Sequence, residues 1–189
     1  MLVAVSTFAQ LKKENSLPVL PFENRLLIKT NVLSLVARRP TISFEKLLPN
    51  GFSAELCLVQ GQFNNLLLTD HYDYSGFLLR LKKYSSRFVP GEANPFMGAY
   101  IGNLTRNIAT EGGSDRTGWF SFPSRYFRGN SIRAGATVGL TYFTKGRLAI
   151  EGLGSMGYGR YLNLDALDPD TYSKGYFDLQ VWLSVGYSF

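Results

Sequence analysis

Cysteine and histidine are almost absent from this sequence, which has 189 residues and one of each. With Cys57 as its single cysteine, the chain cannot form an internal disulfide or a cysteine-based metal cluster, and we expect Cys57 to pack in a core. Charged residues are also few, at 18% against 45% hydrophobic residues. This balance excludes a disordered chain and predicts one folded domain.

Long apolar runs are missing as well. The longest stretch without a charged residue, Leu56 to Thr69, has 14 residues and includes two glutamines and two asparagines. A membrane-spanning helix needs about 18 or more consecutive apolar residues. The sequence therefore excludes a helical span, and insertion into a membrane would require a closed β-barrel.

The net charge of +6 comes from basic residues that are scattered along the chain. A nucleic-acid-binding protein normally gathers such residues on one face, so we predict no nucleic-acid partner. Scattered basic side chains suit contact with anionic headgroups. Outer-membrane lipids and lipopolysaccharide are therefore the predicted surroundings.

The first 24 residues differ in character from the rest. Leu2–Phe8 is a short apolar run followed by small and polar residues, which is typical of the end of a secretory signal peptide, although no basic residue precedes it. We predict a signal-peptide remnant over residues 1–9, a periplasmic lead-in over 10–24 and an outer-membrane barrel over 25–189. A loosely packed N-terminus is the alternative for the first segment.

From Arg25 onward the chain consists of short alternating runs separated by turn residues. Connections after the second and sixth runs are tight, whereas those after the third, fifth and seventh are long and polar, a division typical of membrane barrels. The sequence predicts an all-β fold, an eight-stranded antiparallel up-and-down transmembrane β-barrel. The eight expected strands are Arg25–Val36, Thr41–Leu48, Phe52–Gly61, Tyr74–Tyr84, Pro95–Leu104, Ile132–Phe143, Arg147–Tyr161 and Gly175–Phe189.

Alternation along the runs assigns their faces. In the last run, apolar residues occupy every second position from Phe177 to Phe189, and mostly polar or small residues lie between them. If the polar faces point inward, a lumen charge network of three basic and three acidic side chains results, and a balanced set is tolerable in a narrow interior. Its members are Lys29, Glu45, Glu55, Arg80, Lys82 and Glu151.

The last nine residues, Val181–Phe189, resemble the terminal signal of bacterial outer-membrane proteins, with a final Phe and alternating apolar residues. The resemblance implies recognition by the barrel-assembly machinery through Val181, Leu183, Val185, Tyr187 and Phe189. Four further segments resemble a family of small outer-membrane barrels from Bacteroidetes-type bacteria, known as a domain of unknown function. These are Ile28–Leu33, Pro40–Glu45, Phe96–Tyr100 and Gly135–Gly139, and the family implies a fold and a location but no catalytic residues.

Two groups of residues suggest chemistry. His71 lies near Asp70, Asp73 and Ser75 in the expected third connection, and a Ser-His-Asp arrangement there would suit a membrane-embedded lipid A-modifying hydrolase or acyltransferase. The alternative is a solvated loop histidine, because neighbours in sequence seldom satisfy triad geometry. Asp165, Asp168 and Asp170 could offer oxygens to Ca²⁺, but without a known loop signature we expect an exposed acidic turn. We predict no catalytic, cofactor or metal site.

The longest expected connection, Thr105 to Ser131, is rich in aromatic and arginine residues. Such residues are frequent in protein interfaces, but they would equally cap the barrel mouth or lie among lipid headgroups. The candidate interaction residues are Arg116, Trp119, Phe120, Phe122, Arg125, Tyr126 and Phe127.

Taken together, these patterns predict a non-enzymatic outer-membrane protein with a filled lumen and no open pore. It would be structural, or a small subunit docked to a larger outer-membrane protein. The lipid A-modifying enzyme is the alternative. A soluble lipocalin-like barrel would have an apolar interior and a polar exterior, the reverse of the pattern found here.

Overall fold

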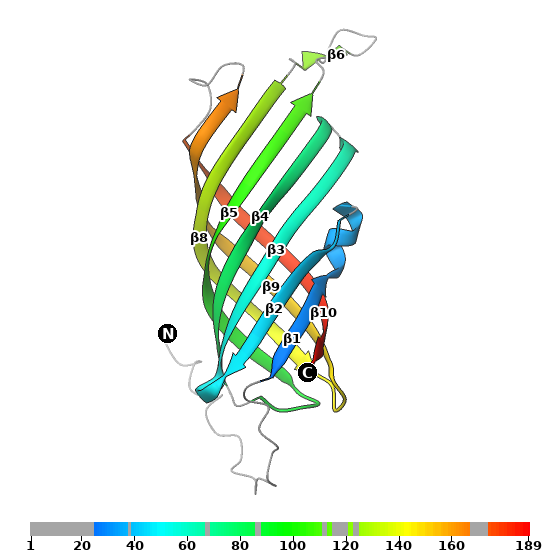
Figure 1. Cartoon of the computed structure of the whole chain (residues 1–189), viewed down its shortest axis with the longest axis vertical. Coiled ribbons are helices and arrows are strands. Elements are labelled where there is room, and N and C mark those ends of the chain that lie inside the picture. Colours follow the sequence, from blue (N-terminus) through cyan, green and yellow to red (C-terminus); the bar gives the residue numbers. More distant parts are fainter. Residues whose placement is uncertain are drawn as a thin grey trace, which may run out of the picture.

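Eight antiparallel strands close into a barrel in the computed structural model of this chain (Figure 1), as the sequence predicts. The structure describes residues 25–37, 39–66, 69–85, 88–110, 113–114, 121–122, 125–166 and 174–189, so the predicted segments 1–9 and 10–24 lie outside it. Around the ring, the order is β1-β10-β9-β8-β5-β4-β3-β2. The barrel strands are β1 (Leu26–Asn31), β2 (Thr41–Leu48), β3 (Phe52–Leu66), β4 (Thr69–Tyr84), β5 (Ala93–Thr110), β8 (Arg125–Phe143), β9 (Leu148–Ala166) and β10 (Gly175–Ser188).

The remaining elements are small. β6 (Gly113–Ser114) and β7 (Ser121–Phe122) pair with each other outside the barrel, and η1 (Val32–Ala37) and η2 (Pro49–Gly51) are 3-10 helices. Among the described residues, no helix is long and apolar enough to cross a membrane. The predicted tight turn before β3 is η2, in which Asn50 adopts a left-handed φ of 61°.

Several strands are longer than the sequence predicts. β3 and β4 continue to Leu66 and from Thr69, so the expected long connection between them is wrong. β5 and β8 likewise extend through much of the segment that was expected to be a loop, to Thr110 and from Arg125. In these extensions most outward side chains are polar, for example Gln62, Asp73 and Arg128, so the regular alternation of apolar with polar residues ends although the backbone ladder continues.

The first predicted strand, Arg25–Val36, is wrong in its second half, because β1 ends at Asn31 and η1 follows. Local hydrogen bonds replace the ladder there. The Asn31 side chain accepts from the backbone N–H of Leu33 at 3.1 Å, and the Ser34 hydroxyl donates to the Asn31 carbonyl at 2.6 Å. Such side chain to backbone bonds compete with strand pairing.

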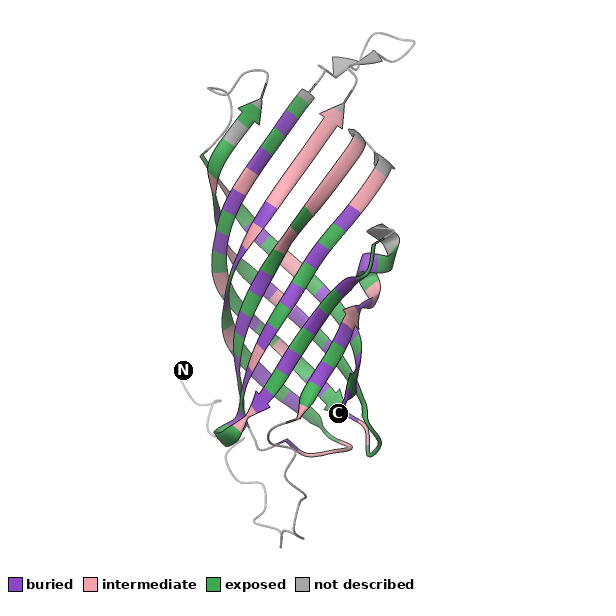
Figure 2. Cartoon of the chain, viewed as in Figure 1, coloured by how far each residue is buried: buried purple, intermediate pink, exposed green. Residues whose placement is uncertain are grey.

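Burial alternates along the strands, as the bands of colour in Figure 2 show. On β10, Trp182 and Ser184 are buried, whereas Leu183 between them is 44% exposed. On β4, Arg80 and Lys82 are buried and Leu79 and Leu81 are exposed. The predicted assignment of polar residues to the inside and apolar residues to the outside is therefore confirmed on these strands.

The barrel wall is low at β1 and β2. β1 pairs with β10 only from Ser184 to Ser188, and β2 pairs with β3 only from Phe52 to Leu58. Above these pairs, among the described residues, β10 is joined only to β9 and β3 only to β4. We call the resulting space, bounded by residues 175–183, η1 and residues 59–66, the lateral notch; η1 contacts both β10 and β3 across it (Figure 1).

Candidate functional site

Lys29 lies at the centre of a cluster of charged side chains inside the barrel. Its ammonium contacts Glu45 Oε2 at 2.5 Å, Glu55 Oε1 at 2.8 Å and Glu151 Oε1 at 2.8 Å. These carboxylates come from β2, β3 and β9, so one side chain on β1 ties together four strands of the ring. All four side chains are almost completely buried.

Lys82 on β4 contacts the same three carboxylates. Its ammonium lies 3.0 Å from Glu45, 2.9 Å from Glu55 and 2.8 Å from Glu151. Hydroxyl groups donate further hydrogen bonds, from Ser53 and Tyr84 to Glu45 and from Thr141 to Glu151. This density of partners offsets the desolvation of the buried charges.

Arg80 extends the cluster upward. It lies 3.5 Å from Glu55 and 3.1 Å from Cys57 Sγ, and its guanidinium stacks on Trp182 with 4.1 Å from Cζ to the ring centroid. The structure thus brings all six residues of the predicted lumen charge network together, with equal numbers of formal positive and negative charges. We call this group, Lys29, Glu45, Glu55, Arg80, Lys82 and Glu151, the ion cluster.

The three carboxylates of the ion cluster lie within 4.8 Å of one another, a geometry that could hold a metal ion. The ammonium groups of Lys29 and Lys82, however, already contact all three carboxylates. A metal would have to displace both of them. The chemistry of the donor set is therefore that of a salt-bridged core.

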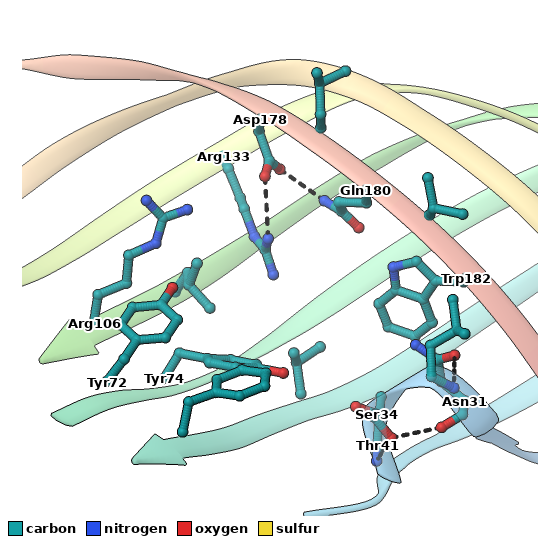
Figure 3. A pocket seen from close by; sticks show the side chains of 16 residues that line it. Asn31, Ser34, Thr41, Tyr72, Tyr74, Arg106, Arg133, Asp178, Gln180 and Trp182 are labelled. Carbon is teal, nitrogen blue, oxygen red and sulfur yellow. Dashed lines mark hydrogen bonds and ion pairs between the residues drawn. The ribbon is translucent and has the colours of Figure 1, made fainter. Parts of the chain in front are cut away.

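A cavity of about 310 Å³ lies above the ion cluster, beside the lateral notch (Figure 3). Its polar wall contains Arg133 from β8, Arg106 from β5 and Asp178 from β10. An aromatic wall lies next to Arg106, formed by Phe63, Tyr72 and Tyr74, whose ring centroids lie 5.6 to 6.3 Å apart. We call this space the rim cavity.

Asp178 is well supplied with hydrogen-bond donors. Its Oδ2 accepts from Tyr100 Oη at 2.9 Å and Gln180 Nε2 at 2.7 Å, and its Oδ1 lies 3.4 Å from Arg133 Nη1. Arg133 has fewer hydrogen-bond partners than its guanidinium could bind. It is only 5% exposed, yet its Nε and Nη2 have no hydrogen-bond partner among the described residues.

Arg133 and Asp178 are not among the lumen charges predicted from the sequence. The necessary signal was present, because alternation over the sixth expected strand places Arg133 on the same face as Gly135 and Thr137. Asp178 lies between the outward Phe177 and Leu179. Arg106 falls in the expected connection Thr105 to Ser131, where alternation predicts no face for its side chain.

His71 lies in β4 and not in a loop, which corrects its predicted position. Its Nε2 lies 2.5 Å from Asp73 Oδ2. Ser75, four residues further along the extended strand, is about 13 Å away measured along the backbone. A serine at that distance cannot pass its proton to the imidazole, so this serine does not complete a triad with His71. The side chain of Asp70 lies outside the described residues.

Other predicted residues fall into two groups. Asp165 is exposed in β9, opposite Arg128 of β8, and Asp168 and Asp170 lie outside the described residues. Of the candidate interaction residues, Tyr126 and Phe127 belong to β8, with Tyr126 exposed and Phe127 buried against Tyr161. The structure does not describe the side chains of Arg116, Trp119, Phe120, Phe122 and Arg125.

No protein-family model matches this chain, and no curated protein matches it in sequence. Among solved structures, it is similar to the crystal structure of Neisserial surface protein A (NspA), with a TM-score of 0.53 and 12% identity. The similarity covers 87% of this chain and 94% of that chain. At this identity it supports the barrel fold and assigns no residue roles. The Bacteroidetes-type family resemblance stays a prediction.

Proposed function

We propose that this protein is a non-enzymatic integral barrel of the bacterial outer membrane, whose lumen is closed by the ion cluster. The supporting observation is the apolar belt on its outer face. On β10 the belt runs from Phe177 to Tyr187, ten positions apart, with exposed apolar residues at every second position between them. Ten residues of strand at a tilt of about 40° span about 25 Å, the height of a membrane barrel's apolar band.

The neighbouring strands carry the same belt. On β8, outward apolar residues run from Ile132 to Tyr142, and the outward residues above them, Asn130 and Arg128, are polar. Aromatic residues mark the belt at both edges of β10, as they do at membrane interfaces. In water, this much exposed apolar surface would favour aggregation.

The segment from Val181 in β10 to Phe189, one residue beyond the strand, fits the proposed assembly signal. The side chains of the signal residues point outward, where a partner in the assembly machinery could contact them before the barrel closes. They are Val181, Leu183, Val185, Tyr187 and Phe189. Lipopolysaccharide and other outer-membrane lipids would surround the finished belt. A separate proposal is that a larger outer-membrane protein docks onto the barrel. Its candidate contact residues are Arg116, Trp119, Phe120, Phe122, Arg125, Tyr126 and Phe127.

The first expected result concerns location. In a fractionated Gram-negative host, the protein should remain with the outer membrane and need detergent for extraction, because the belt requires an apolar solvent. Unboiled, it should migrate as a compact band on a denaturing gel and shift after boiling. Recovery in the soluble periplasmic fraction would contradict the proposal.

The second expected result concerns conduction. Refolded into planar bilayers, the protein should give no stepwise ion current, because an ion crossing the lumen would have to separate Lys29 and Lys82 from their carboxylates. Insertion is verified in parallel by the heat-dependent gel shift. Stable, reproducible conductance steps would show that the ion cluster does not close the barrel.

A further inference from the structure

We propose that the rim cavity is a binding site for an oxyanion, a phosphate or carboxylate group, attached to an apolar or aromatic body. Arg133 provides the first argument. A guanidinium has five N–H donors, and the Nε and Nη2 of this buried one have no partner among the described residues. Buried charged groups normally have their hydrogen bonds satisfied. Phosphates and carboxylates match the guanidinium fork in geometry and charge.

The charge balance of the cavity gives the second argument. Arg106 and Arg133 line it together with one carboxylate, Asp178, so its formal net charge is +1. Asp178 shares its oxygens with Tyr100 and Gln180, and it approaches Arg133 only to 3.4 Å. In contrast to the neutral ion cluster below, the rim cavity therefore has room for one more negative charge.

The aromatic wall defines the rest of the ligand. Phe63, Tyr72 and Tyr74 form a group of neighbouring rings beside Arg106, which is paired with Tyr74 across β4 and β5. A cavity of about 310 Å³ is at the small end of sites for organic ligands. It would hold the anionic end of a molecule with an aromatic ring or the first part of an acyl chain against this wall.

A ligand from the membrane would enter at the lateral notch, where Leu33 and Ser34 of η1 line the cavity. Arg133 follows Ile132, where the unbroken outward apolar run of β8 ends, and therefore lies at the upper edge of the belt, where lipid phosphates are found. Leu179 and Val181 line the cavity at the β10 edge that β1 does not reach. At the lower end of this edge, the backbone N–H of Leu183 donates a hydrogen bond to Asn31 Oδ1 at 3.2 Å, so this N–H has a partner although β1 does not pair with it.

The same oxyanion chemistry could come from a lipid headgroup through the notch or from a free organic anion through the barrel mouth. Two titrations separate these sources. The full chain carrying Trp119→Phe, which leaves Trp182 on the cavity wall as the single tryptophan, is refolded in phosphatidylcholine vesicles. In one arm phenyl phosphate is added, and in the other a rising fraction of phosphatidic acid is incorporated, with Trp182 fluorescence as the readout.

We expect a saturable fluorescence change in at least one arm, and Arg133→Met should weaken it at least about tenfold, because the charge-assisted hydrogen bonds are lost. Arg133→Lys keeps the positive charge but loses the paired N–H donors of the guanidinium, so it should bind with intermediate affinity. If Arg133→Met fails to fold, the comparison of Arg133→Lys with the parent protein provides the test. Arg160→Met, an exposed arginine of β9, is the matched control and should bind like the parent protein.

Saturation with phenyl phosphate alone would assign the site to free anions, and saturation with phosphatidic acid alone would assign it to lipid headgroups. The proposal is overturned if neither probe saturates, or if the Arg133 variants bind as tightly as the parent. Both arms use protein that is already folded in vesicles, whereas fractionation follows the protein in its host, so failure of the binding test is distinguishable from failure of the proposed function.

Discussion

Glu151→Leu should lower the free energy of unfolding by about 3–5 kcal/mol, the usual cost of removing one partner from a well-buried ion pair. Glu151 accepts from Lys29 and Lys82 at 2.8 Å each and from Thr141 at 3.0 Å. Without its carboxylate, three cations of the ion cluster would face two anions in a confined interior. The effect is measured as a shift of the urea midpoint for unfolding from lipid vesicles, with the urea dependence unchanged.

The double variant Lys29→Met, Glu151→Leu is the sharper control. It leaves Arg80 and Lys82 with Glu45 and Glu55, so the formal charges balance again, and it should be less destabilised than the sum of the two single variants. Additive losses would show that the charges act independently and that the ion cluster is not a coupled unit.

Leu183→Arg should also be severely destabilising, by about 2–4 kcal/mol, if Leu183 lies near the centre of the bilayer. Its outward position close to the midpoint between Phe177 and Tyr187 places it there. A charged side chain on this face must remain in hydrocarbon or distort the surrounding lipid. Urea midpoints in vesicles again provide the measurement.

Ser184→Ala is the matched control one residue away, because Ser184 is buried in the lumen opposite Glu151 and the change removes one small hydroxyl. It should be mild. If Leu183→Arg unfolds like the parent protein while Ser184→Ala is strongly destabilised, the assignment of inner and outer faces is inverted and the membrane proposal fails.

The division between inner and outer faces was readable from sequence because it depends on a local property. Side chains of a strand alternate with period two, so Leu183 and Ser184 must face opposite ways in any sheet that contains them. The same rule placed Lys29, Glu45 and Arg80 on inward faces without knowledge of their partners. It failed for residues 32–36, because the side chains of Asn31 and Ser34 offered the backbone a competing set of local hydrogen bonds.

The sequence pattern also did not predict where the strands end at the upper rim. The extension of β4 to His71 depends on pairing with Asn64 of β3 and Ala109 of β5, and neither face of that segment is uniformly apolar. Ladder hydrogen bonds are made by the backbone of every residue type except proline, so they leave little mark in the sequence. Because His71 lies in an extended strand, the backbone keeps Ser75 away from it, and this weakens the triad hypothesis.

By itself, the sequence determined that one folded domain of alternating strands exists, that it has no disulfide of its own, and which face of most strands carries charge. Only the tertiary structure decided which charges meet. Lys29 and Glu151 are 122 positions apart, and their contact depends on the register of every strand around the ring. The low wall at β1 and β2, and with it the rim cavity beside Arg133, likewise follows from how far each strand pairs with its neighbour. Alternation is set by each residue's own backbone, whereas register and closure are set by the sum of many weak contacts between distant segments.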